Sequence, residues 1–248
     1  MEHIISSNIH AHLKDHNILH HAQHGFHKYR SCETQLINTI QDFSLALNNP
    51  EQIDAILLDM SKAFDTVPHE RLCYKLFHYA IRGTTHMWIR NFLSGRTQKV
   101  ILNGQTSNYT NVISGVPQGS VLGPLLFIIY INDLPNNLLS QLILYADDAL
   151  LYRSIHTIAD MHILQKDLNA LHHWASVWLM AFNPSKCEFL QITNKIFPLC
   201  AHYHIDNTTL KQVTSAKYLG DIIDNKLNWS EHTRTVVAKA NSALGFLR

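Results

Sequence analysis

The sequence predicts an α+β fold, in which strands and helices interleave without a regular strand-helix alternation. Two observations carry this prediction: short apolar runs of strand length, and longer segments with apolar residues at helical spacing. The 248 residues suffice for one large domain or two small ones. Hydrophobic residues make up 46% of the chain, which is ordinary for a globular protein and leaves ample material for a core.

The first half of the chain is predicted to be mainly helical around one buried strand. Helices are expected over about 4–19, 35–47, 68–80 and 84–93, and the strand over 53–60. Pro68 suits the first turn of its helix, where a missing N–H is harmless. Asn103-Gly104 lies between the apolar segments 99–102 and 109–113, which predicts a hairpin.

In the second half of the chain, helices and strands are predicted to follow one another in a less regular order. A helix begins near Ser120, and the apolar runs 142–144 and 149–152 read as the strands of a second hairpin. A long helix over 158–180, strands over 188–193 and 217–223, and a helix from Ser230 to the end complete the pattern. The chain opens in mid-helix and stops inside an amphipathic helix without a C-cap, so we expect a fragment of a longer polyprotein.

Charge and cysteine content narrow the function classes. The net charge of +1 gives no global basic signal, so nucleic-acid binding must depend on local patches. The four cysteines are scattered, which disfavours a zinc knuckle or a disulfide framework and favours an intracellular location, cytoplasmic, nuclear or both. The longest apolar stretch, 121–131, is too short to span a bilayer, so we expect no membrane partner.

The most informative feature is Tyr145-Ala146-Asp147-Asp148 at the tip of the second predicted hairpin. Two adjacent negative charges at a hairpin tip are unfavourable unless something compensates them, and a divalent cation is the usual candidate. Oxygen ligands suit Mg²⁺ or Mn²⁺. The alternative is an ordinary turn, because aspartate is common in turns.

Asp59 is a second informative carboxylate. It closes the apolar strand, and strand alternation places it on one face with Ile53, Ala55 and Leu57. A carboxylate at the end of a buried strand is costly unless it is paired or bound to metal. The alternative is a helix cap or turn acceptor, a role that Asp65, just before Pro68, fits better.

Five ordered segments resemble the motifs of reverse transcriptases from non-LTR (LINE-type, jockey-like) retrotransposons. They are 58–65 (Leu-Asp-Met-Ser-Lys-Ala-Phe-Asp), 115–127 (Gly-Val-Pro-Gln-Gly and its helix), 145–148, 183–186 (Asn-Pro-Ser-Lys) and 217–220 (Lys-Tyr-Leu-Gly). The resemblance covers about residues 23 to 230. It implies a right-hand polymerase palm with an antiparallel sheet and packed helices, partial fingers over 1–51, a palm over 52–224 with a fingers-associated insertion at about 72–112, and the start of a truncated thumb over 225–248.

The resemblance implies an RNA-directed DNA polymerase that extends a DNA primer on an RNA template with dNTPs. Asp59, Asp147 and Asp148 would hold two Mg²⁺ ions, with Mn²⁺ as a substitute, and Asp148 would bind less directly. The main-chain carbonyl of Met60 would be a further ligand. Lys186 would protonate the pyrophosphate leaving group, although a solvated lysine is an equal alternative.

Other matched positions would contact the substrates. Phe64 would exclude a 2′-hydroxyl, and Gln118 with Gly119 would contact the nascent base pair or template. A core aromatic and a plain strand-to-helix turn are the respective alternatives. Lys62 would reach substrate phosphates, unless it is simply solvated.

The primer end would be held by a hairpin at Tyr218, Leu219 and Gly220. The basic residues Arg234, Lys239 and Arg248 of the last helix resemble the start of a thumb that packs on the template–primer duplex; a merely solvated face is the alternative.

The segment 23–32 resembles the fingers motif Gln-x-Gly-Phe-Arg-x-Gly-Arg-Ser, in which Lys28 and Arg30 would grip phosphates. Two departures put triphosphate affinity in doubt. His27 replaces an arginine and removes a bidentate donor, and Tyr29 replaces a glycine that would allow a positive φ.

Two other readings compete with an active polymerase. One is a catalytically inactive retrotransposon remnant that retains only nucleic-acid binding, suggested by the cut ends and the altered fingers motif. The other is a histidine-rich metal site, because the chain has eighteen histidines and His16, His20 and His24 are spaced for one helix face.

Overall fold

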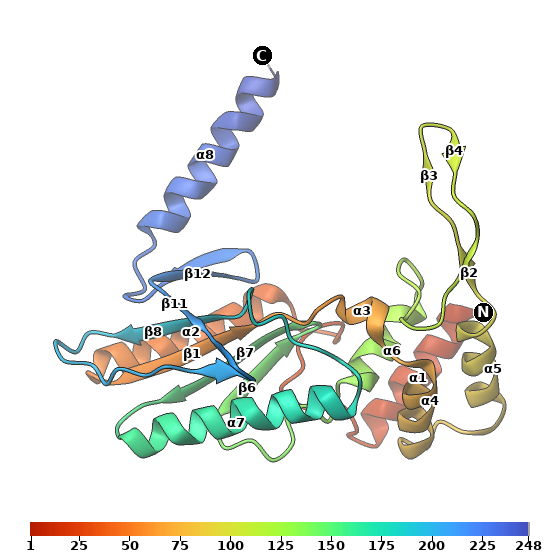
Figure 1. Cartoon of the computed structure of the whole chain (residues 1–248), viewed down its shortest axis with the longest axis horizontal. Helices are drawn as coiled ribbons and strands as arrows, with labels where there is room; N and C mark the ends of the chain where they lie inside the picture. Colours follow the sequence, from red (N-terminus) through yellow and green to blue (C-terminus); the bar gives the residue numbers. More distant parts are fainter. Residues whose placement is uncertain (248) are drawn as a thin grey trace.

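A five-stranded sheet forms the centre of the computed structural model, which describes residues 1–247 (Figure 1). Its strand order is β11-β8-β1-β7-β6. The strands are β1 (Gln52–Leu58), β6 (Gln141–Tyr145), β7 (Asp148–Ser154), β8 (Glu188–Thr193) and β11 (Lys211–Val213). All neighbours pair antiparallel except β11 and β8, which are parallel.

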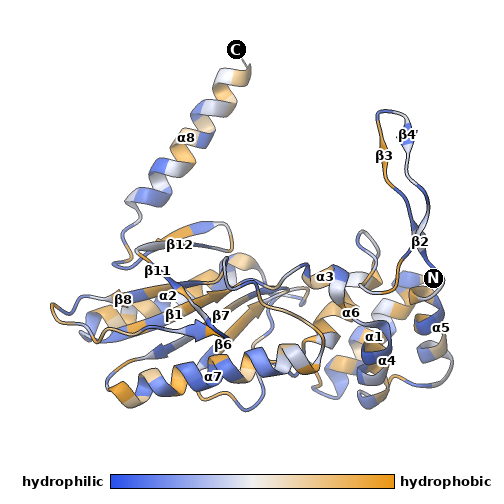
Figure 2. Ribbon diagram, viewed as in Figure 1, coloured by the Kyte–Doolittle hydropathy of each residue, from blue (hydrophilic) through white to orange (hydrophobic). Residues whose placement is uncertain are grey.

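The central strand β1 is buried on both faces, and its alternation sorts its side chains between two cores. Ile53 and Ala55 pack in the cluster that contains Phe43 of α2 (Cys32–Asn48). Ile56 packs in the other cluster, which contains Leu168 of α7 (Ile158–Val177). The two helices therefore cover opposite faces of the sheet, and the predicted side-chain alternation is confirmed. Figure 2 shows α7 with alternating hydrophobic and hydrophilic segments, as a helix with one buried face requires.

A helical subdomain adjoins one end of the sheet. Its buried axis is α6 (Leu122–Tyr130), a nearly all-apolar helix that is buried along almost its whole length. An amphipathic helix would have left one face in water, whereas an apolar helix of this kind belongs inside a core. Around it lie α1 (Glu2–Asp15), α3 (Ala63–Thr66), α4 (His69–His78) and α5 (Gly83–Leu93).

The predicted hairpin around Asn103-Gly104 is confirmed and projects from this subdomain (Figure 1). Both turn residues have positive φ, 49° and 79°, as a tight turn between twisted strands requires. Its strand pairs are β2 (Thr97–Gln98) with β5 (Thr110–Asn111), and β3 (Ile101–Leu102) with β4 (Gln105–Thr106).

The C-terminal part contains two hairpins and a projecting helix. They are β9 (His204–Ile205) with β10 (Thr208–Thr209), β12 (Ser215–Tyr218) with β13 (Asp221–Asp224), and α8 (Ser230–Leu247), which stands away from the sheet in Figure 1. The single strand predicted over 217–223 is wrong. Leu219 and Gly220 both take positive φ, 48° and 102°, so the chain reverses there and forms a hairpin.

Two predicted helices end early for the same reason. The helix predicted over 4–19 ends at Asp15, before Asn17 with a φ of 49°. The helix predicted over 158–180 ends at Val177, before Leu179 with a φ of 55°. Arg248 of the predicted thumb face lies outside the described residues. Across residues 1–247, no helix combines the length and apolarity needed to cross a membrane.

Candidate active site

The three predicted carboxylates lie at the same end of the central sheet. Asp147 lies in the turn between β6 and β7, and Asp148 begins β7. The last registered pair of β1 with β7 is Leu58 with Ala149. Asp59 and Asp148 are the next residues on these two strands, so the register brings them together across 89 positions of sequence.

The closeness of these carboxylates affects their pKa values. Burial raises the pKa of Asp147, and the negative charge of Asp59 raises it further. Burial likewise raises the pKa of Asp148, and so do the charges of Asp147 and Asp59, against the opposing charge of Lys217. Mutual repulsion in a partly buried cluster is the condition that a bound cation relieves.

Within residues 1–247, no group of three or more His, Cys, Asp or Glu side chains is arranged so that it could hold a metal ion. A cluster of carboxylates at a strand end still fits Mg²⁺. This ion keeps several waters and is bound through one or two carboxylates together with substrate phosphates, rather than by an all-protein cage. The donor set of Asp59, Asp147 and Asp148 supplies oxygen ligands of that kind.

The segment that contains Lys186 is joined to the end of β1. The Asp59 carbonyl accepts from the Asn183 N–H at 2.8 Å, and the Ser61 N–H donates to the Ala181 carbonyl at 2.8 Å. These two hydrogen bonds form a β-bridge between Met60 and Phe182, and neither of them uses the Met60 carbonyl. The Met60 side chain is buried in the core. The Lys186 Nζ lies 3.9 Å from Asp59 Oδ2.

The residues predicted to contact substrate lie beside this end of the sheet. Phe64 is half-buried and stacks on Phe127 of α6, with ring centroids 4.2 Å apart. Gln118 and Gly119 are exposed in the turn before α6. The Nε2 of Gln118 donates to Asp65 Oδ1 at 2.8 Å, so Asp65 anchors this turn and is not the cap of α4.

Lys62 is exposed and lines a cavity of about 720 Å³ at the base of the β2–β5 hairpin. Arg96 and Gln118 line the same cavity. Asp65 lines it as well, so two cations, one carboxylate and a neutral amide surround this cavity.

The two basic residues of the fingers segment (residues 23–32) make different contacts. The Arg30 guanidinium donates to the carbonyls of His21 and Gln23, at 2.8 and 2.7 Å, and so holds its own loop. Lys28 is exposed, with its Nζ 4.9 Å from the centre of the Tyr29 ring. Tyr29 takes a φ of 66°, so the chain adopts the left-handed conformation despite the loss of glycine.

The hairpin of Tyr218, Leu219 and Gly220 lies on the α2 side of the sheet. Tyr218 is buried, and its hydroxyl is hydrogen-bonded to the Gln35 side chain of α2. Burial raises the pKa of Tyr218, and the charge of Asp148 raises it further, which places this hairpin next to the carboxylates. Tyr218 thus has a packing role that its motif did not indicate.

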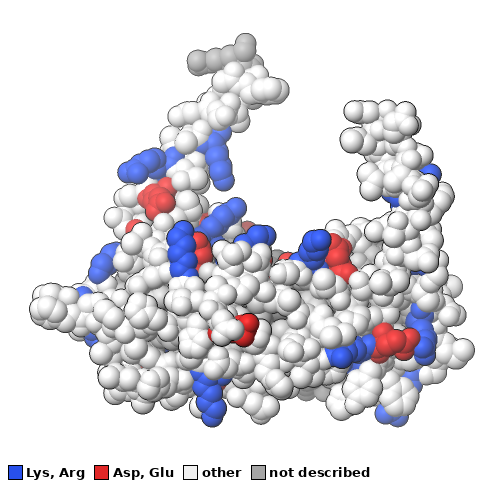
Figure 3. Space-filling view, viewed as in Figure 1, with Lys and Arg blue, Asp and Glu red and all other residues white. Residues whose placement is uncertain are grey.

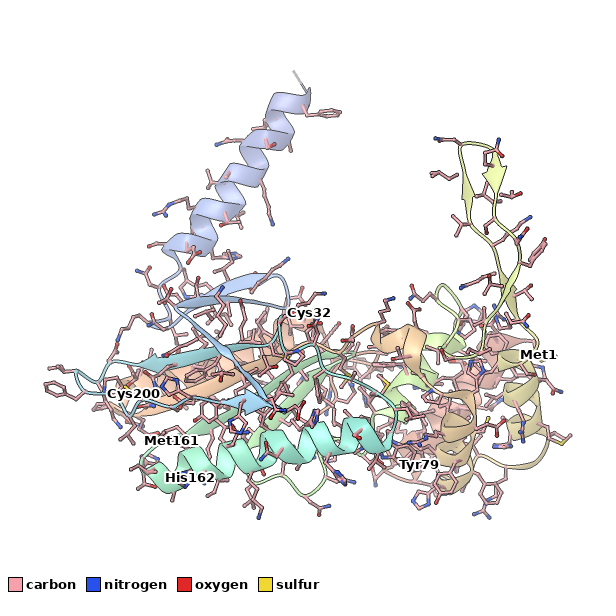
Figure 4. The ribbon with its side chains drawn as sticks, viewed as in Figure 1. Met1, Cys32, Tyr79, Met161, His162 and Cys200 are labelled. Atoms are coloured by element: carbon pink, nitrogen blue, oxygen red, sulfur yellow. The ribbon has the colours of Figure 1, made fainter. Side chains whose placement is uncertain are left out.

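The N-terminus of α2 also lies at this end of the sheet, where Figure 4 labels Cys32. The neighbouring Cys32 side chain raises the pKa of Tyr145, so the two side chains lie close to each other. In Figure 3 the molecular surface between α8 and the β2–β5 hairpin is hollowed, and lysine and arginine side chains lie along its floor with acidic side chains beside them.

The geometry contradicts the histidine metal site. Its premise was one helix face, but α1 ends at Asp15. The Nδ1 of His16 is hydrogen-bonded to the His12 carbonyl, and the Nδ1 of His20 accepts from the Ala22 N–H. The three rings therefore do not form a common site.

A family model described as "Reverse transcriptase (RNA-dependent DNA polymerase)" matches residues 3–223. The chain is 33% identical over 235 residues to the "RNA-directed DNA polymerase from mobile element jockey" of Drosophila funebris, covering 88% of this chain and 25% of that protein. It is 30% identical over 260 residues to the "Probable RNA-directed DNA polymerase from transposon BS" of Drosophila melanogaster, covering 100% of this chain and 28% of that protein. The chain thus spans about a quarter of the length of these curated relatives.

Solved structures of telomerase share the fold. The apo telomerase from Candida tropicalis matches with a TM-score of 0.59 at 11% identity, covering 92% of this chain and 40% of that one. A form truncated from its C-terminal domain matches with a TM-score of 0.58 at 11% identity, covering 91% and 44%. At this identity the likeness shows the fold alone, and it confirms the predicted α+β right-hand polymerase architecture.

Proposed function

The chain belongs to the reverse transcriptase family, and on that premise we propose that it catalyses RNA-directed DNA synthesis in retrotransposition. Its substrates are an RNA template, a DNA primer and dNTPs. The observation that carries the proposal is the convergence of Asp59, Asp147 and Asp148 at one sheet end, with Lys186 3.9 Å from Asp59.

The three carboxylates and the main-chain carbonyl of Met60 would hold two divalent ions, Mg²⁺ or Mn²⁺. When bound, such ions lower the pKa of a primer 3′-hydroxyl and neutralise charge on the transferred phosphate. Burial, and then repulsion between the carboxylates, raises the pKa values of Asp147 and Asp148. A bound cation would favour the ionised carboxylates, so ion binding and full ionisation of the site are coupled.

The other side chains orient substrate and move a proton. Lys186 is exposed beside Asp59, where its ammonium can give a proton to the departing pyrophosphate. The ring of Phe64, which stacks on Phe127, would exclude a ribose 2′-hydroxyl. Gln118, held by Asp65, presents the turn that would contact the templating base.

The nucleic acid would lie in the hollow between α8 and the β2–β5 hairpin (Figure 3). Lysine and arginine side chains on its floor match the charge of a phosphate backbone. The β12–β13 hairpin next to Asp148 would hold the primer end. Lys28, Arg30 and Lys62 would supply further phosphate contacts, with Arg30 acting mainly through its loop.

We also propose an intracellular location, cytoplasmic, nuclear or both. All four cysteines are free thiols, which is the usual state in a reducing compartment.

Primer extension tests the proposal. Full-length protein with poly(rA)/oligo(dT), dTTP and Mg²⁺ is expected to extend the primer, and Asp147→Asn is expected to abolish extension while leaving duplex binding intact. Asp206→Asn is the matched control, because Asp206 also lies in a tight hairpin turn, between β9 and β10, and is exposed.

Two outcomes would overturn the proposal. Extension that persists in Asp147→Asn would refute the metal-ligand assignment. Duplex binding without any extension by the wild type would instead identify an inactive remnant that retains only nucleic-acid binding.

A further inference from the structure

We infer that Gln23 is a positioning residue: its side chain holds the main chain of Ala146 and thereby fixes the direction of Asp147 and Asp148. The inference rests on the proposed function for its catalytic consequence. Gln23 comes from the fingers segment and meets the carboxylate turn across 123 positions of sequence.

The contacts involve both polar atoms of the Gln23 amide. Its Oε1 accepts from the N–H of Ala146 at 3.0 Å and from the N–H of Gly25 at 2.7 Å. Its Nε2 donates to the carbonyl of Ala146 at 3.4 Å. Gln23 is only 1% exposed, so water cannot replace these partners without opening the site.

Ala146 needs such support because its backbone is unusual. Its φ is 54°, a left-handed conformation that a residue with a β-carbon adopts only at a cost. Ala146 is also buried, at 7% exposure, so its N–H and carbonyl require partners. The carbonyl of Ala146 belongs to the peptide that carries Asp147, so rotation of this peptide would redirect the carboxylate.

Main-chain hydrogen bonds on both sides of Gln23 join the same two segments. The His24 N–H donates to the Leu144 carbonyl at 2.8 Å, and the Leu144 N–H donates to the Ala22 carbonyl at 2.9 Å. The fingers segment thus pairs with β6 directly before the turn. A β-carbon on Gly25 would lie 2.4 Å from the Ala146 nitrogen, so glycine is required for this approach.

Arg30 completes the unit by donating to the Gln23 carbonyl at 2.7 Å. The fingers segment and the carboxylate turn are therefore one hydrogen-bonded assembly. Because a misplacement of about 1 Å at a reacting centre can lower the rate by about 10²-fold, a support of this kind affects turnover without touching substrate.

Gln23→Met tests the inference, because methionine has a similar length but cannot hydrogen-bond to Ala146. We expect kcat for primer extension to fall about 10- to 100-fold, while KM for dTTP and Kd for the duplex change less than about 3-fold. Hydrogen exchange at the Ala146 amide should accelerate at least about 10-fold.

Gln165→Met is the matched control. Gln165 clamps both main-chain groups of His204, at 2.8 and 3.0 Å, in the same manner and away from the carboxylates. It should accelerate exchange at His204 and leave kcat unchanged.

Two further variants guard against a fold defect. Gln23→Glu keeps an acceptor for the Ala146 and Gly25 N–H groups, so it should retain protection at Ala146. Gly25→Ala should reproduce the Gln23→Met phenotype from the other side, whereas Gly245→Ala, with open space around its added carbon, should not.

The inference is overturned if Gln23→Met matches the wild type in kcat and exchange, if it loses no more activity than Gln165→Met, or if Gln23→Glu exchanges as fast as Gln23→Met. The exchange measurement does not require polymerase activity. If the wild type is inactive but exchange at its Ala146 amide still accelerates in Gln23→Met, the proposed function is refuted. The inference that Gln23 holds Ala146 is then retained.

Discussion

The Lys186 Nζ lies 3.9 Å from Asp59 Oδ2, yet the two side chains are 66% and 40% exposed. An exposed ion pair of this kind contributes little to stability. The exposed lysine is therefore accessible for the proposed role in leaving-group protonation.

Replacement of Lys186 should therefore affect chemistry and not folding. We expect Lys186→Gln to lower single-turnover kcat about 10²-fold and to change the free energy of unfolding by less than about 0.5 kcal/mol. Lys211→Gln, at an exposed lysine of β11, should leave both unchanged. Lys186→Arg separates charge from proton transfer, because arginine retains the charge but gives up its proton much less readily. Full activity in Lys186→Arg would contradict the general-acid role.

Phe64 has both a packing and a substrate role in the proposed mechanism. Because its ring stacks on Phe127, we expect Phe64→Ala to lower the free energy of unfolding by about 1–3 kcal/mol. We also expect it to raise incorporation of rUTP relative to dTTP by at least about 10-fold, since the excluded space opens. Phe64→Tyr should preserve the ratio. If Phe64→Ala loses stability but keeps the ratio of rUTP to dTTP incorporation, Phe64 has only a packing role.

Lys75 of α4 should be important for stability, although no motif contains it. Its Nζ lies 3.8 Å from the ring centre of Trp178 and 4.8 Å from those of Tyr130 and Trp174, and it pairs with Asp133. We expect Lys75→Met to lower the free energy of unfolding by about 3 kcal/mol in urea denaturation, because it leaves Asp133 without its cation.

Lys99 provides the control for this measurement. Its Nζ lies 5.0 Å from the Tyr109 ring centre in the exposed hairpin, so Lys99→Met should lower the free energy of unfolding by less than about 1 kcal/mol. Equal effects of the two substitutions would show that the buried cation is dispensable.

His27 should make the fold sensitive to acid. Burial first, and then the neighbouring Arg30, His10 and His24, lower its pKa to about 4. Between pH 6.5 and about 4 the unfolded chain binds a proton that the folded chain does not. The free energy of unfolding should therefore fall as the pH falls through this window, by at most about 1.4 kcal/mol per pH unit from this group.

His27→Gln should reduce that slope when urea unfolding is compared at pH 7, 6 and 5. The exposed His202→Gln is the control and should retain the wild-type slope. An identical slope in His27→Gln and the wild type would locate the acid sensitivity elsewhere.

The sequence by itself determined the elements whose signals are local. The alternation of 53–58 placed Asp59 at a strand end, and the apolar runs around Asp147 and Asp148 placed them at a hairpin turn, because side-chain period and turn chemistry act over a few residues. Motif resemblance then predicted their chemistry. The domain boundaries at 51/52 and 224/225 and the substrate roles stay predictions.

Only the tertiary structure decided which distant groups pair. Arg30 reads as a phosphate ligand in the sequence, but its guanidinium holds its own loop. Tyr218 packs against Gln35, and Gln23 supports Ala146. The physical reason is that a buried polar group must find a partner wherever packing places one, and such partners can lie more than 100 positions away. Sequence patterns that extend over a few residues therefore cannot predict these pairings.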